Sequence, residues 1–111
     1  MPRDIQSIRH DPLTALQEIG AFVEGKSLAE LQSDRALQLI LEREFEILGE
    51  AFYRLRNADP DLFEIIPNAH RIIGMRNIIA HGYDSVDYEI LWDAATCETG
   101  PLRAAVERLQ A

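Results

Sequence analysis

The chain has 111 residues, of which 47% are hydrophobic and 27% are charged, so we expect one globular domain over residues 1–111. Its apolar runs are far shorter than a membrane span, residues 1–4 lead into no apolar signal region, and the single Cys97 excludes an internal disulfide. We therefore expect a cytoplasmic protein that contacts no membrane and needs no metal or cofactor.

The charge balance limits how the chain could bind an anionic partner. Nineteen acidic residues against eleven basic ones give a net charge of −8, and Lys26 is the only lysine. Proteins that bind nucleic acids unaided usually show a basic surface. A nucleic-acid site here would have to be local, built on Arg76 with Arg71 or Arg43 and doubled by a partner chain.

Helical patterns begin near the N-terminus. Apolar residues at helical spacing predict a helix over residues 4–24. Pro12 lies inside this range, so it should either kink the helix or begin it anew with Asp11 as the N-cap. Ser27 and Glu30 have the spacing of a capping box, which predicts a short helical turn.

A long helix is predicted over about residues 34–57, opened by Asp34 and ended by Asp59 and Pro60. Six apolar residues recur along it at alternating steps of four and three, as in a coiled coil: Leu37, Leu41, Phe45, Leu48, Phe52 and Leu55. Four others widen the apolar face: Leu39, Ile40, Ile47 and Ala51. Either the helix is buried in its own domain, or part of the second stripe meets a second subunit.

Acidic residues crowd the same helix, namely Glu42, Glu44, Glu46 and Glu50. Most are expected on a solvated face, paired in part with Arg43 and Arg54. Glu46 or Glu50 could instead orient Arg76 through a charge-assisted pair.

The C-terminal half contains further helices and breaks. Residues 60–67 should form a connector, and Asn68 should be the N-cap of the next helix. A helix over about residues 86–97, capped by Asp84 and Ser85, should be interrupted at residues 99–101 before a last helical segment to residue 109. The sequence has no strand pattern. We predict an all-α fold, a compact bundle of four to five helices.

The stretch from Gly74 to Tyr83 sets polar side chains into an apolar segment. At ~100° per residue, one arc that could face a core holds Ile72, Met75, Ile78 and Ile79, and the opposite arc holds Arg76, Asn77 and His81. Tyr83 would return to the side of Arg76 if the helix continued through Gly82. Ile73 falls on the polar arc, which indicates that something covers it, most simply the same helix of another subunit.

These residue types suit cleavage of a phosphodiester without a metal. His81 could take the proton of a 2′-hydroxyl, and Arg76, which is always charged, could stabilise the charge that develops on phosphorus. The alternative is that both are surface residues, or that His81 caps the helix C-terminus. Spacing alone favours this plainer alternative, because short motifs match by chance.

A family resemblance changes that balance. Arg76-Asn77, three further residues and His81-Gly82-Tyr83 resemble the R-N-x-x-x-H-x-Y signature of HepT-like proteins in the HEPN superfamily. Residues 46–51, Glu-Ile-Leu-Gly-Glu-Ala, resemble the E-I-[IL]-G-E-A block of the family's long second helix. The similarity continues, in order, through Ile66-Pro67, residues 72–77, Val86-Asp87 with Ile90 and Trp92, and Pro101-Leu102.

The resemblance implies a HEPN-like bundle and the toxin of a prokaryotic type VII toxin–antitoxin system. Such toxins are metal-independent endoribonucleases that act on tRNA or mRNA as homodimers, with two motifs at a shared cleft. It implies that Arg76 and His81 are catalytic, that Asn77 supports them, and that an MNT-type nucleotidyltransferase antitoxin AMPylates Tyr83. The alternative is a HEPN binding module that cuts no RNA and is only the partner or substrate of a nucleotidyltransferase.

Overall fold

The structure is a computed structural model that describes the backbone of residues 5–81 and 86–109 and the side chains of residues 11–79 and 86–109. The described residues form α1 (Ile5–Val23), α2 (Leu28–Ser33), α3 (Arg35–Ala58), α4 (Pro60–Glu64), α5 (Ala69–His81), α6 (Tyr88–Asp93), the π-helix η1 (Ala94–Glu98) and α7 (Thr99–Glu107). They contain no strand, which confirms the all-α prediction.

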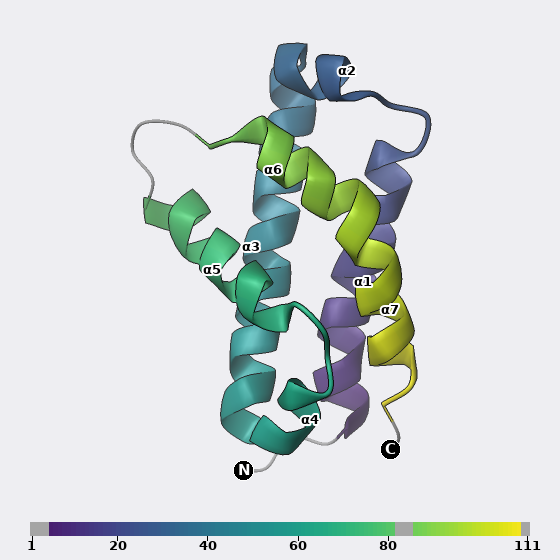
Figure 1. Ribbon diagram of the computed structural model, residues 1–111, viewed down its shortest axis with the longest axis vertical. Helices are drawn as coiled ribbons and strands as arrows, with labels where there is room; N and C mark the ends of the chain where they lie inside the picture. The colour runs from purple at the N-terminus through teal and green to yellow at the C-terminus, as the bar shows by residue number, and fades with distance from the viewer. Residues whose placement is uncertain (1–4, 82–85, 110–111) are drawn as a thin grey trace.

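Helix α3 is the central element of the bundle. It contacts α1, α2, α4, α5 and α6, and α7 packs on α1. In Figure 1, α5 crosses α3 diagonally, and α6, η1 and α7 form one continuous column that crosses the bundle. Counting that column as one, the described residues form four long helical elements and two short ones. No helix among these residues is long and apolar enough to cross a bilayer.

The apolar seam of α3 forms the middle of the core, as predicted. Each of its six residues is at most 5% exposed. The seam packs in one cluster with buried residues of α1 and α7, among them Leu16, Ile19, Leu102 and Val106. Burying a side chain of this size contributes roughly 1.5–3 kcal/mol, so the seam holds α3 between its neighbours.

The first helix differs from the prediction at its proline. Helix α1 runs through Pro12, which is buried, so no new helix begins at Asp11. Proline removes one backbone hydrogen bond from a helix interior, and packing against the bundle can outweigh that loss. The helical turn predicted after Ser27 is confirmed with Ser27 as its N-cap: the Ser27 hydroxyl accepts a bond from the Glu30 N–H at 3.2 Å and donates to the Glu30 carboxylate at 3.3 Å.

Two predicted irregular segments are helical. Residues 60–64, expected in a connector, form α4 because Pro60 stands in a first turn, where no N–H is required, and Asp59 caps it. Residues 99–101, expected to interrupt a helix, form the first turn of α7. Pro101 is tolerated there for the same reason, and η1 joins this turn to α6.

Two helix starts also differ from the prediction. Asp87 caps α6, since its carboxylate accepts bonds from the backbone N–H of residues 89 and 90, and the predicted caps Asp84 and Ser85 lie outside the described residues. The Asn68 carbonyl accepts the first backbone bonds of α5, although Asn68 has a left-handed φ of 65° in place of an extended one.

Candidate active site

Helix α5 packs on the core with part of the predicted arc: Ile72 is buried, and Met75 and Ile79 are partly buried against the core cluster. The rest of the buried face differs from the prediction. Ala69, Ile72 and Ile73 are buried, and Ile78 is 60% exposed. At ~100° per residue Ile78 lies about 180° from Ala69, on the side away from the core. The prediction that a second subunit covers Ile73 is wrong, because its own chain leaves only 6% of it exposed.

The stem of Arg76 lies on the inward face of α5, where the prediction had put it on the outer arc. The buried Gly49 of α3 makes room for it. A Cβ atom built on Gly49 would overlap the Arg76 Cβ and would lie 3.1 Å from the Ile72 carbonyl oxygen. The missing side chain at Gly49 therefore lets the two helices approach one another where Arg76 leaves α5.

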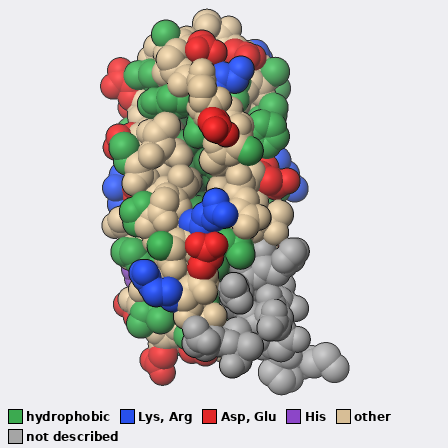
Figure 2. Space-filling model, turned by 90° about the vertical axis from the view of Figure 1, so that its right-hand side faces the viewer, with side chains coloured by type: hydrophobic (Ala, Val, Ile, Leu, Met, Phe, Trp, Pro, Cys, Tyr) green, Lys and Arg blue, Asp and Glu red, His purple; other side chains and the backbone are tan. Residues whose placement is uncertain are grey.

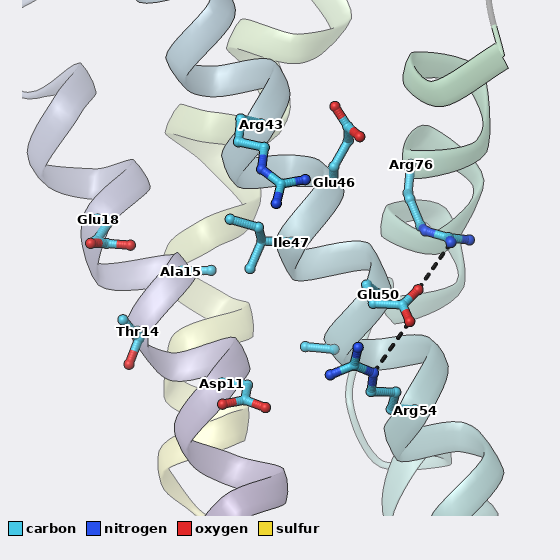
Figure 3. Close-up of a pocket in the computed structure, with 11 residues that line it drawn as sticks. Asp11, Thr14, Ala15, Glu18, Arg43, Glu46, Ile47, Glu50, Arg54 and Arg76 are labelled. Carbon is cyan, nitrogen blue, oxygen red and sulfur yellow. Dashed lines mark hydrogen bonds and ion pairs between the residues drawn. The ribbon is translucent and has the colours of Figure 1, made fainter.

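Polar and aromatic groups surround the Arg76 guanidinium. Its NH2 atom lies 3.0 Å from Glu50 Oε2, its NH1 atom donates to Asn77 Oδ1 at 3.2 Å, and its carbon lies 5.9 Å from the centre of the Tyr53 ring. The other Glu50 oxygen accepts from Arg54 Nε at 3.2 Å (Figure 3). Of the two glutamates considered from the sequence, Glu50 is therefore the one that pairs with Arg76.

Arg76 borders a cleft of about 630 Å³. The lining residues are Asp11, Thr14, Ala15 and Glu18 of α1, Arg43, Glu46, Ile47, Glu50, Ala51 and Arg54 of α3, and Arg76 of α5. Figure 3 shows the α1 residues along one wall and the α3 residues, with Arg76 beyond them, along the other. The α1 wall has two carboxylates, and the opposite wall has all three arginines together with the carboxylates of Glu46 and Glu50. The positive charge therefore lies on one side, but the whole lining has four carboxylates and three guanidinium groups. The volume of the cleft is in the range of small-molecule sites.

Away from the cleft, Lys and Arg residues do not gather into a basic patch on the face drawn in Figure 2. On the face drawn in Figure 2, Lys and Arg side chains are scattered singly among Asp and Glu. Of the two arginines considered as companions of Arg76, Arg43 lines the cleft, whereas Arg71 pairs with the nearly buried Glu98 at 3.3 Å and is not part of the lining. The positive charge at the cleft thus comes from Arg43, Arg54 and Arg76, beside the carboxylates listed above.

A carboxyl with an unusual pKa lies near the α1 wall. Burial, a hydrogen bond with Glu18 and the negative charge of Glu18 raise the pKa of Glu44 to about 7, against the opposing effect of Arg43. Glu44 is 8% exposed, and its Oε1 has no hydrogen-bond partner. We therefore expect the charge of Glu44, between α1 and α3, to change near neutral pH.

The rest of the predicted motif is described in part. The backbone of α5 ends at His81, about 7.5 Å along the helix axis from Arg76, and the His81 side chain is outside the described residues. Tyr83, and the predicted return of its side chain toward Arg76, also lie outside them. Sequence reasoning assigned no role to Gly49 or Tyr53, although an isolated glycine within an apolar helix often indicates a close packing contact.

Comparison of the chain with known proteins identifies its family. The family model described as ribonuclease HepT-like matches residues 13–109. The chain belongs to this family. RNase MJ1380 and RNase MJ0125 of Methanocaldococcus jannaschii, both named provisionally, are 27% and 26% identical to it over 107 residues. These matches cover 95% of each chain for the first, and 96% of this chain and 91% of the relative for the second. No solved structure shows significant similarity. The family and these relatives together support an RNase-type HEPN protein.

Proposed function

We propose that this HepT-like chain is a metal-independent endoribonuclease and the toxin of a type VII toxin–antitoxin system. The observation that carries the proposal is the Arg76 side chain, 34% exposed, whose guanidinium lies beside Glu50 and Asn77 at a cleft. An arginine in this position can bind a phosphate with two donors while the flanking nucleotide occupies the cleft. Membership of a ribonuclease family supports the same proposal.

The proposed reaction uses the RNA's own 2′-hydroxyl as the nucleophile. The His81 imidazole takes the hydroxyl proton, the 2′-oxygen attacks phosphorus, and the bond to the 5′-oxygen breaks to leave a 2′,3′-cyclic phosphate. The proton then goes to the departing 5′-oxygen. Arg76 stabilises the charge on the phosphoryl oxygens, and Asn77 supports it as a hydrogen-bond partner.

The test of the reaction is cleavage of total RNA by the purified chain in EDTA. Loss of a general acid–base group typically lowers the rate by roughly 10²–10⁴, so His81→Ala and Arg76→Ala should each abolish visible cleavage. A requirement for a divalent ion would refute the mechanism. Intact RNA with the wild type would favour the alternative, a non-catalytic binding module.

We also propose that the active form is a homodimer in which two motifs share one cleft. Exposed apolar residues support it: Ile78 of α5 is 60% exposed, Ile90 of α6 is 50% exposed, and a small apolar groove lies between the two helices. Leu39 and Ile47 add exposed apolar surface on α3. Sedimentation should give a dimer at micromolar concentration, and a fully active monomer would contradict this proposal.

The proposed regulator is an MNT-type nucleotidyltransferase antitoxin that AMPylates Tyr83. An AMP ester two residues after His81 would add bulk and negative charge near the proposed catalytic groups. RNA phosphate would then meet like charge, so both binding and cleavage should fall. Intact-mass measurement after incubation with the partner and ATP should show added mass on the wild type and none on Tyr83→Phe. Equal gain on both would place the modification elsewhere.

A further inference from the structure

We infer that one turn of α3 forms a socket for Arg76, made of Gly49, Glu50 and Tyr53, and that Glu50 is the positioning residue through which the socket controls RNA cleavage. This inference rests on the proposed function, because it assumes that Arg76 acts on the scissile phosphate. Glu50 is assigned no contact with RNA and acts only through Arg76.

The socket begins at the stem of Arg76. Gly49 lies under the Cβ and Cγ atoms of Arg76, so close that any side chain there would displace them. Arg76 therefore leaves α5 directly against the surface of α3. Its position along α3 is set by backbone packing, which is more rigid than a contact between long side chains.

The charged end is fixed by Glu50. This residue follows Gly49, and its two oxygens serve two arginines: Oε2 lies 3.0 Å from Arg76 NH2, and Oε1 accepts from Arg54 Nε at 3.2 Å. Arg54 lies four residues after Glu50, so it holds the carboxylate within α3. A carboxylate bound on its other side to its own helix can orient Arg76 better than a free one.

The aromatic ring of Tyr53 lies near the Arg76 guanidinium on a third side and limits the positions that it can take. The ring centre lies 5.9 Å from the Arg76 guanidinium carbon and 5.3 Å from that of Arg56. A guanidinium has five N–H donors, of which Arg76 directs one to Glu50 and one to Asn77. Donors therefore remain for a phosphate, on a group whose orientation is already set before RNA binds.

Orientation matters because a long side chain loses rotamer freedom, worth about 2 kcal/mol, when it is held in one geometry. Because the socket already orders the Arg76 side chain before the substrate binds, this entropy is not lost during the reaction. We therefore expect the socket to raise kcat. Glu50 also brings a negative charge close to the phosphate site, which opposes RNA binding. Removing the charge while keeping the shape should therefore lower kcat and leave KM unchanged or smaller.

The decisive comparison is Glu50→Gln against Glu107→Gln. Each glutamate pairs with an arginine four residues away on its own helix, Glu50 with Arg54 on α3 and Glu107 with Arg103 on α7, and each change raises the net charge from −8 to −7. Glu107 is not part of the cleft lining. The substrate is a random-sequence single-stranded RNA oligonucleotide pool that carries a fluorophore and a quencher. We expect Glu50→Gln to lower kcat roughly 10–100-fold, the effect of losing an orienting partner at metal sites, without raising KM. Glu107→Gln should keep the wild-type kcat.

Two further variants distinguish a failure of the socket inference from a failure of the proposed function. Glu50→Asp keeps the charge on a shorter side chain and should be more active than Glu50→Gln, and an Asp variant no more active than the Gln variant would count against an orienting carboxylate. If Arg76→Ala cuts RNA as well as the wild type, the proposed function fails.

If Arg76→Ala is inactive while Glu50→Gln behaves like Glu107→Gln, the proposed function stands and the socket inference is wrong. A raised KM with an unchanged kcat in Glu50→Gln would also overturn it, because Glu50 would then contribute to substrate binding.

Discussion

The two sides of α3 are built differently. One side is the seam of leucine and phenylalanine, each at most 5% exposed, which packs in one core cluster with residues of α1, α5 and α7. The other side is a close approach to α5 at Gly49, followed by an ion pair at Glu50, which lines a cleft. The first side depends on buried volume, and the second depends on the position of one guanidinium. Substitutions should therefore unfold the protein on the first side and change activity on the second.

The largest loss of stability is expected from Phe45→Ala in the seam. Phe45 is fully buried, and removing such a ring leaves a cavity that costs roughly 3–5 kcal/mol. Domains of this size are stable by about 5–15 kcal/mol, so the variant should be marginally folded. Urea unfolding measures the change, and a loss well under 1 kcal/mol would show that the core is not continuous here.

Gly49→Ala should have a smaller effect on stability and a large one on activity. The new methyl group would overlap the Arg76 stem, so α5 must shift, at a cost of roughly 1–3 kcal/mol for overpacking. A misplaced Arg76 should lower RNA cleavage well beyond the fraction of protein that unfolds. Cleavage rates are compared at a temperature where both proteins are folded.

The matched control is Gly74→Ala in α5. A Cβ atom built on Gly74 would meet nothing within 4 Å, and alanine favours the helix by about 0.5–1 kcal/mol. This variant should be slightly more stable than the wild type and fully active. Equal activity of the two alanine variants would mean that Gly49 does not position Arg76.

The difference between the two sides of α3 also explains which parts of the fold could be predicted from the sequence. The seam of α3 could be predicted because its six apolar residues follow one helical period, so they lie on one face of the helix, and that face is buried away from water. Helix α5 has apolar residues on nearly every side, so periodicity allowed several orientations. In the observed orientation Ile78 is exposed and the stem of Arg76 packs on Gly49, a residue of another helix that a pattern within α5 does not include.

Prolines show the limit of local rules. Pro12, Pro60 and Pro101 each suggested a break, and each lies within a helix. Two of them stand in a first turn, where the missing N–H costs nothing, and the third is held by packing. The roles of Arg76, Asn77, His81 and Tyr83 stay predictions, since catalysis depends on contacts with RNA and on the region around residues 80–85 that is outside the described side chains.

A pH series should sharpen the comparison at the junction between α1 and α3. The pKa of Glu44 is raised from 4.5 to about 7 in the folded protein, so the folded state binds a proton that the unfolded state releases. Stability should therefore fall as pH rises from about 4.5 and level off above about 7, by roughly 1–3 kcal/mol.

Glu44→Gln provides the control, because its amide cannot ionise. The difference in unfolding free energy between wild type and variant should grow with pH across this window, which removes the contribution of other titrating groups. A difference that is constant from about pH 5 to about pH 8 would show that the pKa of Glu44 is not raised.

The smallest change in stability is expected at Ile78, on the outer side of α5. Ile78 is 60% exposed, and a polar substitution at such a position usually alters stability by about 0.5 kcal/mol or less. Ile78→Asp should therefore fold normally. If α5 and α6 form the proposed dimer surface, the new carboxylate would be buried without a partner there, and the dimer should dissociate.

Ile65→Asp is the matched control, because Ile65 is 65% exposed at the C-terminal end of α4 and lies outside the apolar groove between α5 and α6. Sedimentation should give a monomer for Ile78→Asp and a dimer for Ile65→Asp, with nearly equal unfolding midpoints extrapolated to low protein concentration. Cleavage should fall only in the first, because each proposed cleft would lose its second motif. A dimer that survives Ile78→Asp would move the interface to another surface, and the exposed Leu39 and Ile47 of α3 would be the next to test.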